Sequence, residues 1–230
     1  MLHILQSAKS PSESNKILRA MFAARKSVFV DLLKWNVPVI DDLYEVDEFD
    51  TEDAIYLVLC DEDGNHLGST RLLPTIKPHI LDSLYPELCA EAPPRGPTIF
   101  EITRFCLDRR SFASQRRKIR DTLVSALADY ALGNGITAYS AIADQQWAMQ
   151  ISNFGWRYEL LGSPRACAGR MLVAFHILVT YDILDLLNGA DIRPDPELIA
   201  DPPKQPGILR KELPLIDANT LQTRQSLQHR

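Results

Sequence analysis

The sequence predicts a single α/β domain over residues 1–190 and a proline-rich tail over residues 191–230. Three observations lead to this prediction. Runs of apolar and β-branched residues interleave with segments whose apolar residues recur at helical spacing, which is the pattern of a sheet covered by helices. The turn sequence DEDGN separates two apolar runs, as expected for a β-hairpin. Five prolines fall between residues 191 and 206, after the last periodic segment.

The first half of the chain should contain one amphipathic helix, one hairpin and two irregular stretches. Ser12 or Ser14 can cap the helix. Residues 34–53 are acidic and irregular, and residues 85–97 form a proline-rich loop. The elements expected here are a strand at 3–6, a helix at 12–33, strands at 54–60 and 66–73, and a short helix near 79–84.

The second half opens with the clearest strand candidate, TIFEITRFCLD at 98–108. Gly133 and Gly135 are interpreted as the stop of the helix that follows, rather than as a nucleotide-binding loop. From Asp191 onward the periodicity ends, and a polar, extended or mobile tail is expected. The remaining elements are a helix at 114–132, a strand at 136–143, a helix at 145–154, strands at 156–161 and 170–179, and a helix at 180–188.

The composition argues against a nucleic-acid-binding, membrane-spanning, secreted or metal-binding protein. The net charge of -5 argues against binding nucleic acid through the overall field, and no apolar run approaches the ~20 residues that span a bilayer. The amino terminus is too short and too quickly polar for a signal peptide. The four cysteines are widely spaced, without a zinc-site or redox motif. We therefore expect a cytoplasmic protein without a metal site, acting on small molecules rather than on nucleic acid or membranes.

Acidic residues crowd the loop YEVDEFDTED at 44–53. A solvated acidic loop is the ordinary interpretation, but Val46 and Phe49 interrupt the acids and should make the loop pack. Arginines stand at apolar positions elsewhere, and a buried arginine needs an anionic partner because it keeps its charge. A charge cluster that binds a zwitterionic ligand is thus predicted. Its candidate members are Arg25, Arg71 and Arg104 with acids from the set Glu45, Asp47, Glu48, Asp50, Glu52 and Asp53.

Glu101 interrupts the otherwise apolar strand at 98–108. Strict alternation would place Glu101 and Arg104 on opposite faces of that strand. For both to reach one site, a β-bulge near Ile102–Thr103 is required, and such bulges re-aim side chains beside active sites. The alternative is that Glu101 only forms a structural ion pair with Arg71.

A basic segment, DRRSFASQRRKIRD, follows this strand directly at 108–121. It is interpreted either as a solvated helix face or as a patch that binds phosphate near a helix amino terminus. The residues of this patch are Arg109, Arg110, Arg116, Arg117, Lys118 and Arg120.

These scattered positions resemble a known family, the LuxI-type acyl-homoserine-lactone synthases, over about residues 1–185. The matching residues are Arg25, Phe29, Trp35, Glu45, Asp47 and Asp50 in EVDEFD, Arg71 in GSTRLLPT, and Glu101 and Arg104 in FEITRFCLD. The resemblance implies a GNAT-like fold, a twisted mixed β-sheet flanked by helices. It also implies a two-step reaction, in which the amine of S-adenosylmethionine attacks an acyl thioester and its carboxylate then displaces methylthioadenosine to close a lactone.

The resemblance also implies roles for individual residues. Arg25, Phe29 and Trp35 would order the amino-terminal lobe around S-adenosylmethionine, and the acids would join the arginines in the charge cluster. Glu101 would act as general base through a water, and no prosthetic group or metal would be needed. The basic patch would bind the phosphate of an acyl-carrier protein or of coenzyme A. Candidate acyl-pocket residues, which could equally be core, are Phe105, Leu123, Leu127, Ala143 and Trp147.

Two departures from the family pattern bear on the acyl donor. Ala143 stands where the family often carries a threonine associated with 3-oxo acyl chains, which favours an unsubstituted or differently substituted chain. The expected helix at 145–154 lacks the basic residues that some members use to dock acyl-carrier protein. A coenzyme A thioester is therefore an alternative to the carrier protein.

Competing functions belong to other classes. A GNAT-type N-acetyltransferase acting on another amine should carry a glycine-bearing phosphate loop, whereas this chain has RRSFASQRRKIR at that place. A non-catalytic sensor of S-adenosylmethionine or an acyl ligand would not need the base Glu101. A methyltransferase is disfavoured because no glycine-rich fingerprint follows any expected strand.

Overall fold

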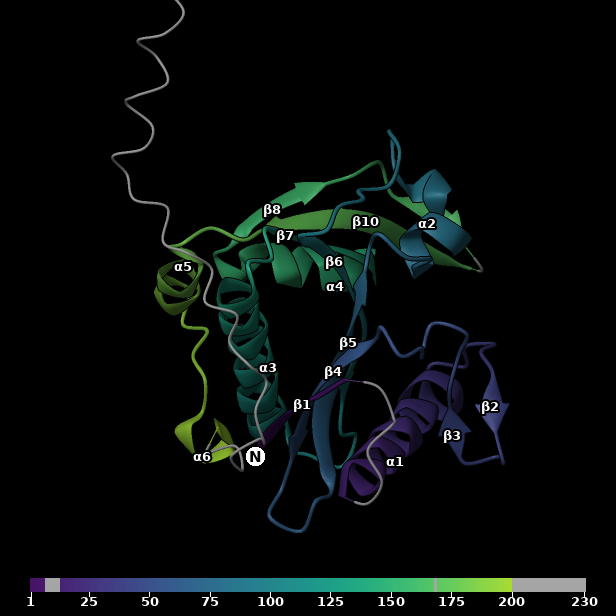
Figure 1. The fold of residues 1–230 in the computed structure, drawn as a ribbon, viewed down its shortest axis with the longest axis vertical. Coiled ribbons are helices and arrows are strands. Elements are labelled where there is room, and N and C mark those ends of the chain that lie inside the picture. Colours follow the sequence, from purple (N-terminus) through teal and green to yellow (C-terminus); the bar gives the residue numbers. More distant parts are fainter. Residues whose placement is uncertain (7–12, 168, 200–230) are drawn as a thin grey trace, which may run out of the picture.

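The computed structural model describes residues 1–6, 13–167 and 169–199, and its centre is a mixed eight-stranded sheet (Figure 1). Seven strands run in the order β1-β4-β5-β6-β7-β10-β8, and β9 pairs with β10. Only the central pair, β6 with β7, is parallel among the described strands. The strands are β1 (Leu2–Gln6), β4 (Ile55–Cys60), β5 (His66–Pro74), β6 (Ile99–Leu107), β7 (Ala138–Asp144), β8 (Arg157–Leu160), β9 (Arg165–Cys167) and β10 (Arg170–Leu178).

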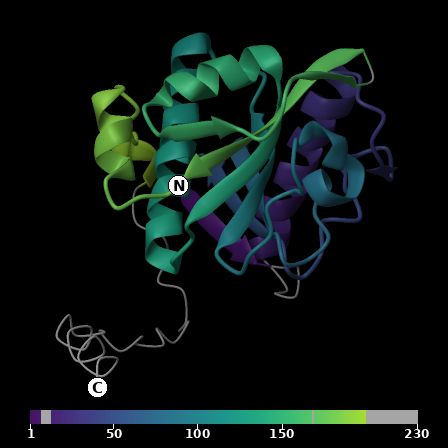
Figure 2. The same cartoon turned by 90° about the horizontal axis from the view of Figure 1, so that it is seen from above.

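Helices cover both faces of the sheet (Figure 2). The long helix α3 (Ala113–Asn134) packs on one face with α4 (Gln145–Ile151), and α5 (Ile183–Gly189) packs against α3. The opposite face carries α1 (Glu13–Arg25) and α2 (Ile80–Leu84). The shorter elements are the π-helix η1 (Lys26–Leu32), the 3-10 helices η2 (Pro86–Leu88) and η3 (Ser152–Phe154), α6 (Pro196–Ile199), and the small sheet of β2 (Val39–Ile40) and β3 (Tyr44–Glu45).

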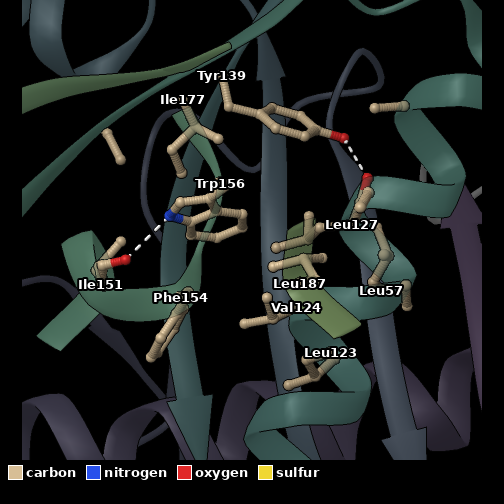
Figure 3. Close-up of a cluster of buried hydrophobic side chains, with 14 of the residues drawn as sticks. Leu57, Leu123, Val124, Leu127, Tyr139, Ile151, Phe154, Trp156, Ile177 and Leu187 are labelled. Atoms are coloured by element: carbon tan, nitrogen blue, oxygen red, sulfur yellow. Dashed lines mark hydrogen bonds between the residues drawn. The ribbon is translucent and has the colours of Figure 1, made fainter. Parts of the chain in front are cut away.

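The main core lies between α3 and the sheet (Figure 3). Two buried aromatic side chains in this core donate hydrogen bonds to backbone carbonyls. The Tyr139 hydroxyl donates to the Leu127 carbonyl at 2.9 Å, and Trp156 Nε1 donates to the Ile151 carbonyl at 2.9 Å. Gly68 lets α3 approach β5 closely, since a Cβ there would lie 2.6 Å from Ile119 Cγ2. The core is therefore closely packed where α3 crosses β5.

The predicted bulge exists, but it lies further along β6 than expected. Ser69 pairs with Cys106 and Arg71 pairs with Thr103, so the single residue Thr70 faces two residues of β6, Arg104 and Phe105. Arg104 has a φ of 51°, in the left-handed region that residues other than glycine seldom adopt. The bulge predicted near Ile102–Thr103 is therefore present, with its extra residue at Arg104–Phe105, where the left-handed turn occurs.

The parallel strands β6 and β7 separate after a short paired region. Their register runs from Ile99 with Ala138 to Ile102 with Ala141, whereas β6 continues to Leu107 and β7 to Asp144. Beyond this point the two central strands diverge, and the interior of the sheet opens. Residues of both strands line two cavities there.

Most elements expected from the sequence are present, with differences at their ends. The expected helix at 12–33 becomes α1 followed by the π-helix η1, and Ser12 lies outside the described residues. Gly133 is still helical, and Gly135 alone ends α3 in a left-handed conformation with a φ of 66°. The strand β9 and the small sheet β2-β3 were not anticipated. They are two or three residues long, too short for periodicity to reveal them.

The start of the expected tail is part of the packed structure. Ile192 is buried, and α6 contacts α3. The Asp195 amide donates to Thr122 Oγ1 at 2.9 Å, and its carboxylate lies 3.0 Å from Lys118 Nζ. Residues 200–230 lie outside the described part, where the expectation of an extended tail stays a prediction. Among the described helices, none is long and apolar enough to cross a membrane.

Candidate active site

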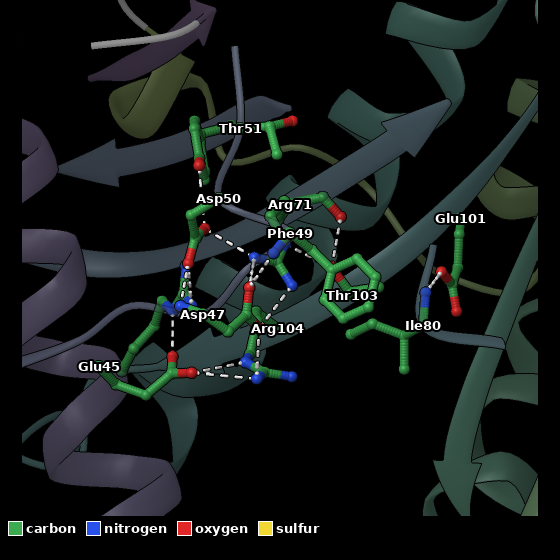
Figure 4. A network of polar contacts seen from close by, with 12 residues as sticks. Glu45, Asp47, Phe49, Asp50, Thr51, Arg71, Ile80, Glu101, Thr103 and Arg104 are labelled. Atoms are coloured by element: carbon green, nitrogen blue, oxygen red, sulfur yellow. Dashed lines mark hydrogen bonds and ion pairs between the residues drawn. The ribbon is translucent and has the colours of Figure 1, made fainter. Parts of the chain in front are cut away.

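Six charged side chains from α1, from β3 and the loop after it, and from β5 and β6 form one network (Figure 4). Both terminal nitrogens of Arg25 donate to Asp50, at 2.8 and 2.9 Å, and Arg25 Nε donates to Glu45. The network comprises Arg25, Arg71, Arg104, Glu45, Asp47 and Asp50. The sequence prediction that these arginines and acids of the EVDEFD loop meet is confirmed by these contacts.

Asp47 joins the other two arginines. Arg71 donates to both oxygens of Asp47, at 2.6 and 3.0 Å, and Arg104 Nη2 donates to Asp47 at 2.6 Å and to Glu45 at 3.0 Å. Arg71 Nε also donates to Thr103 Oγ1 at 2.9 Å. The left-handed Arg104 is what turns its guanidinium to the same face of the sheet as Thr103, so the bulge completes the network.

The network compensates its own charge. Three guanidinium groups face three carboxylates, and Arg25, Arg71 and Asp50 have side chains only 1% exposed. Burial by itself would raise the pKa of Asp50, but hydrogen bonding and the charges of Arg25 and Arg71 outweigh it and hold this pKa below its usual range. Removing one partner would leave a buried, unpaired charge. The inner part of the network is thus a scaffold that fixes the acidic loop against the sheet.

Glu101 lies apart from this network, and its carboxylate is held by a helix start (Figure 4). Its oxygens accept hydrogen bonds from the backbone amides of Ile80, at 2.7 Å, and Leu81, at 2.9 Å, the first two residues of α2. The alternative of a structural ion pair with Arg71 is not what the structure shows, because Arg71 is bound to Asp47, Asp50 and Thr103.

Burial sets the proton affinity of Glu101. The side chain is fully buried, and this burial raises the pKa of its carboxyl to about 7, against the opposing effect of the Leu81 and Ile80 amides and of the more distant Arg71. A carboxylate with a pKa near neutrality exchanges protons readily with an amine. The raised pKa therefore lets the buried Glu101 carboxylate accept a proton near neutral pH.

Two cavities, each of about 560 Å³, meet at the opening between β6 and β7. The polar cavity is lined by Glu101, Asp47, Glu48, Phe49, Tyr85 and Asn36, among others. The aromatic cavity extends toward the core between α3, α4 and the sheet, and is lined by Phe105, Trp147, Phe154, Trp156, Leu127 and Val124, among others. Residues that line both cavities include Trp35, Thr103, Arg104, Ala143, Asp144 and Arg170.

The aromatic residues predicted near the start of the chain lie at this junction. The rings of Phe29 and Trp35 stack with centroids 4.8 Å apart and planes inclined by 22°. The guanidinium carbon of Arg104 lies 5.6 Å from the Phe29 centroid, and that of Arg170 lies 5.6 Å from the Trp35 centroid. Two cations and two rings thus form the wall between the cavities.

The structure separates the predicted binding residues into two groups. Phe29, Trp35, Asp47, Arg104 and Glu101 line at least one cavity. Those that do not line either described cavity are Arg25, Glu45, Asp50 and Arg71. The second group can act on a ligand only through the residues that it holds.

Four of the five predicted acyl-pocket residues line the aromatic cavity: Phe105, Leu127, Ala143 and Trp147. The fifth, Leu123, does not line it and is fully buried in the core where α3 approaches β5. Leu123 and Leu127 are one helical turn apart on the same face of α3, and helical spacing alone does not reveal which of them lines a cavity.

The predicted phosphate patch is also divided. Arg109 and Arg116 are exposed and line the aromatic cavity. Arg110 pairs with Asp108 at 3.0 Å. The other three form ion pairs elsewhere on the surface: Arg117 with Asp121 and Asp191, Lys118 with Asp195, and Arg120 with Asp121. Of these six cations, only Arg109 and Arg116 therefore line either of the two described cavities.

Several side chains and backbone amides at the two cavities were not predicted from the sequence. The amides of Ile80 and Leu81, which hold Glu101, cannot be identified from residue types. Thr103 could have been found, because it lies on the same face as Glu101 by strand alternation. Arg170 is the cation at the start of the otherwise apolar segment RMLVAFHIL, and this was the available signal. Within the described ranges, no cluster of three or more metal-ligating side chains occurs.

Known proteins are similar to this chain in sequence and in fold. A family model described as autoinducer synthase matches residues 9–182. An acyl-homoserine-lactone synthase from Ralstonia nicotianae is 30% identical over 183 residues, which cover 76% of this chain and 89% of that protein. An isovaleryl-homoserine lactone synthase from Bradyrhizobium diazoefficiens is 28% identical over 221 residues, covering 95% of this chain and 92% of that protein.

A solved structure agrees with these sequence relatives. The CoA-dependent acyl-homoserine lactone synthase BjaI, in complex with SAM and isopentyl-CoA, superposes with a TM-score of 0.74 at 26% identity, covering 85% of this chain and 93% of that one. The expected mixed sheet flanked by helices in one domain is confirmed. The chain belongs to the autoinducer synthase family, the enzymes that acylate S-adenosylmethionine from an acyl thioester and close the product to an N-acyl-homoserine lactone.

Proposed function

We propose that this chain binds S-adenosylmethionine in the polar cavity and an acyl-coenzyme A in the aromatic cavity, with Glu101 as the general base between them. The observation that carries this proposal is the position of Glu101. Its buried carboxylate lines the polar cavity, beside the Thr103–Arg104 segment that lines both cavities. An amine held in one cavity can there meet a thioester carbonyl presented from the other.

The first step forms an amide. The amine nitrogen attacks the thioester carbonyl carbon and gives its proton to Glu101, directly or through one water. The tetrahedral intermediate then expels the thiolate, and that thiolate takes up the proton. In this proposal, N–H groups of Arg104 and of the bulge backbone, next to both cavities, donate hydrogen bonds to the negative oxygen of the intermediate.

The second step closes the lactone. The substrate carboxylate attacks the γ-carbon of its own side chain, and the bond from that carbon to the sulfonium breaks. Methylthioadenosine leaves as a neutral molecule, so no acid is needed. The step depends on holding the amino-acid chain in a curled conformation, which is the effect that a closely fitting cavity supplies.

Coenzyme A is the proposed donor because the surface offers little to an acidic carrier protein. Helix α4 contains no lysine or arginine, and its exposed residues Gln145, Gln146, Met149 and Gln150 are uncharged. Arg117, Lys118 and Arg120 are already paired with acids of this chain. Arg109 and Arg116 at the aromatic cavity suffice for a small phosphate-bearing donor. The related BjaI is CoA-dependent, which supports this choice.

The aromatic cavity supports an acyl group without polar substituents. Ala143 offers no hydroxyl at the junction, and the indole nitrogen of Trp156, which lines this cavity, already donates to the Ile151 carbonyl. A keto or hydroxyl group on the chain would lose its hydration here without replacement. We therefore propose a short, unsubstituted or methyl-branched acyl chain, in keeping with the name of the isovaleryl relative. Since both substrates are metabolites of the cell interior, the proposed place of action is the cytoplasm.

A donor panel tests this proposal. The full chain is incubated with S-adenosylmethionine and matched acyl-coenzyme A and acyl-carrier-protein thioesters, and methylthioadenosine release is measured. The expected result is release with unsubstituted acyl-coenzyme A donors, and a raised KM for them in Arg116→Gln. Arg110→Gln is the matched control, because Arg110 is also exposed but pairs with Asp108. Turnover with carrier-protein donors alone would contradict the choice of coenzyme A.

A further inference from the structure

Arg170 is a cation at the junction of the two cavities that the roles assigned above do not use. It is the first residue of β10, is half-buried, and lines both the polar and the aromatic cavity. Its Nη2 donates to the Leu33 carbonyl at 2.7 Å, and its guanidinium lies over the Trp35 ring. These contacts hold the group in place, and none of them neutralises its charge.

Arg170 differs from the other cations of the polar cavity in its lack of a carboxylate partner among the described residues. Arg104 already shares Glu45 and Asp47, so its charge is balanced within the network. Lys34 also lines this cavity, but it is exposed to solvent. Arg170 has no carboxylate within ion-pair distance among the described residues, although Asp144 lines the same two cavities. A half-buried guanidinium without an anion is costly, which indicates that its anion is a ligand.

The proposed substrate brings one carboxylate to this place. A guanidinium presents parallel N–H groups that match the two oxygens of a carboxylate. We propose that Arg170 binds the α-carboxylate of S-adenosylmethionine; this rests on the assignment of the polar cavity to that substrate. Binding there places the neighbouring amine toward Glu101 and the aromatic cavity during acylation. It also keeps the carboxylate, the nucleophile of lactone closure, near the carbon that it later attacks.

Binding measurements with three ligands test the role of Arg170. Calorimetry compares S-adenosylmethionine, decarboxylated S-adenosylmethionine and methylthioadenosine, which share the nucleoside but differ in the amino-acid part. In the unmodified protein, S-adenosylmethionine should bind at least about tenfold more tightly than its decarboxylated analogue. Arg170→Gln should weaken S-adenosylmethionine by about 10- to 100-fold, with the other two ligands changed less than about twofold.

Matched variants separate this role from a structural one. Arg165→Gln removes a charge from β9, opposite Leu172 of the same hairpin, and should change none of the three affinities because Arg165 lines neither described cavity. Arg170→Lys keeps the charge and should recover part of the affinity for S-adenosylmethionine. Equal weakening of all three ligands in Arg170→Gln would overturn the inference and leave only support of Trp35. If the unmodified protein binds none of the three, the assignment of the polar cavity fails instead.

Discussion

Arg104 shows how one residue conformation brings together groups that strand alternation would separate. Its left-handed backbone turns its guanidinium toward Glu45 and Asp47, on the face that also carries Glu101 and Thr103. The sequence was enough to predict that a bulge was needed, because Glu101 and Arg104 are three residues apart in a strand. Its position was decided by the pairing of β5 with β6, which the sequence of β6 does not contain.

Asp50 should matter for folding more than for ligand affinity. Asp50→Asn leaves the buried Arg25 and Arg71 short of one negative charge, so we expect the free energy of unfolding to fall by about 3–5 kcal/mol. Urea denaturation measures this change. Glu48→Gln, in the same loop but exposed, is the control and should stay within about 0.5 kcal/mol. An Asp50→Asn protein of unchanged stability that binds S-adenosylmethionine poorly would contradict a scaffold role.

Glu101 should impose a pH dependence near neutrality. The base accepts a proton only when ionised, and its pKa is raised to about 7, so kcat/KM should fall about tenfold from pH 8 to pH 6. Glu101→Gln should fold but lose most acylation activity, and its residual rate should lack this fall. If the same fall persists in Glu101→Gln, the titrating group is another one.

The raised pKa of Glu101 should also make the stability of the folded protein depend on pH. The folded state holds this proton more tightly than the unfolded chain does, so the contribution of Glu101 to stability decreases as the pH rises from about 4.5 through about 7. As the pH rises from 5 to 8, the unmodified protein should therefore lose stability relative to Glu101→Gln. Urea denaturation at the two pH values measures the difference, and a change of opposite sign would refute the raised pKa.

At the scale of elements, α3 and the divergence of β6 from β7 shape the site. The parallel pairing ends at Ile102 and Ala141, and the aromatic cavity extends from there beneath α3 and α4. Periodicity predicted α3 and both strands, because each is long and patterned. It did not predict the divergence, since the point where β6 and β7 stop pairing is not contained in the periodicity of either strand.

Two glycine substitutions test how closely α3 packs. In Gly68→Ala the new Cβ would lie 2.6 Å from Ile119 Cγ2 and 3.0 Å from Leu123 Cδ1, so we expect a loss of about 1–3 kcal/mol in stability. Gly133→Ala, inside α3 with nothing within 4 Å of the new Cβ, should instead gain up to about 1 kcal/mol. Thermal unfolding compares the two. Equal stability for both variants would show that α3 moves away from β5 without cost.

At the scale of the whole molecule, the packed structure includes residues that composition assigned to the tail. Proline content placed the boundary at residue 190, whereas Ile192 is buried and α6 packs on α3. Two prolines in a short segment do not prevent packing when neighbouring apolar side chains are buried. Local composition cannot indicate this, because the surface that receives Ile192 is formed by distant residues.

Two truncations measure where the folded unit ends. Removal of residues 200–230 should leave both the free energy of unfolding and methylthioadenosine release unchanged. Removal of residues 191–230 also deletes Ile192 and the Asp195 contacts with Thr122 and Lys118, and should cost about 2–4 kcal/mol. Urea denaturation separates the two outcomes. If the chain of residues 1–199 were much less stable than the full chain, residues beyond 199 would belong to the folded unit.

The sequence by itself determined the fold class, the principal elements, the family and the members of the charge network. These depend on periodicity, on fixed spacing, and on the need of a buried arginine for an anion. Tertiary structure alone decided which of those charges neutralise one another and which face a cavity. It also decided that backbone amides of α2 hold Glu101, and that Arg170 has no carboxylate partner within the described part of the chain. The physical reason is that burial and electrostatic compensation are properties of residues brought together from distant parts of the chain.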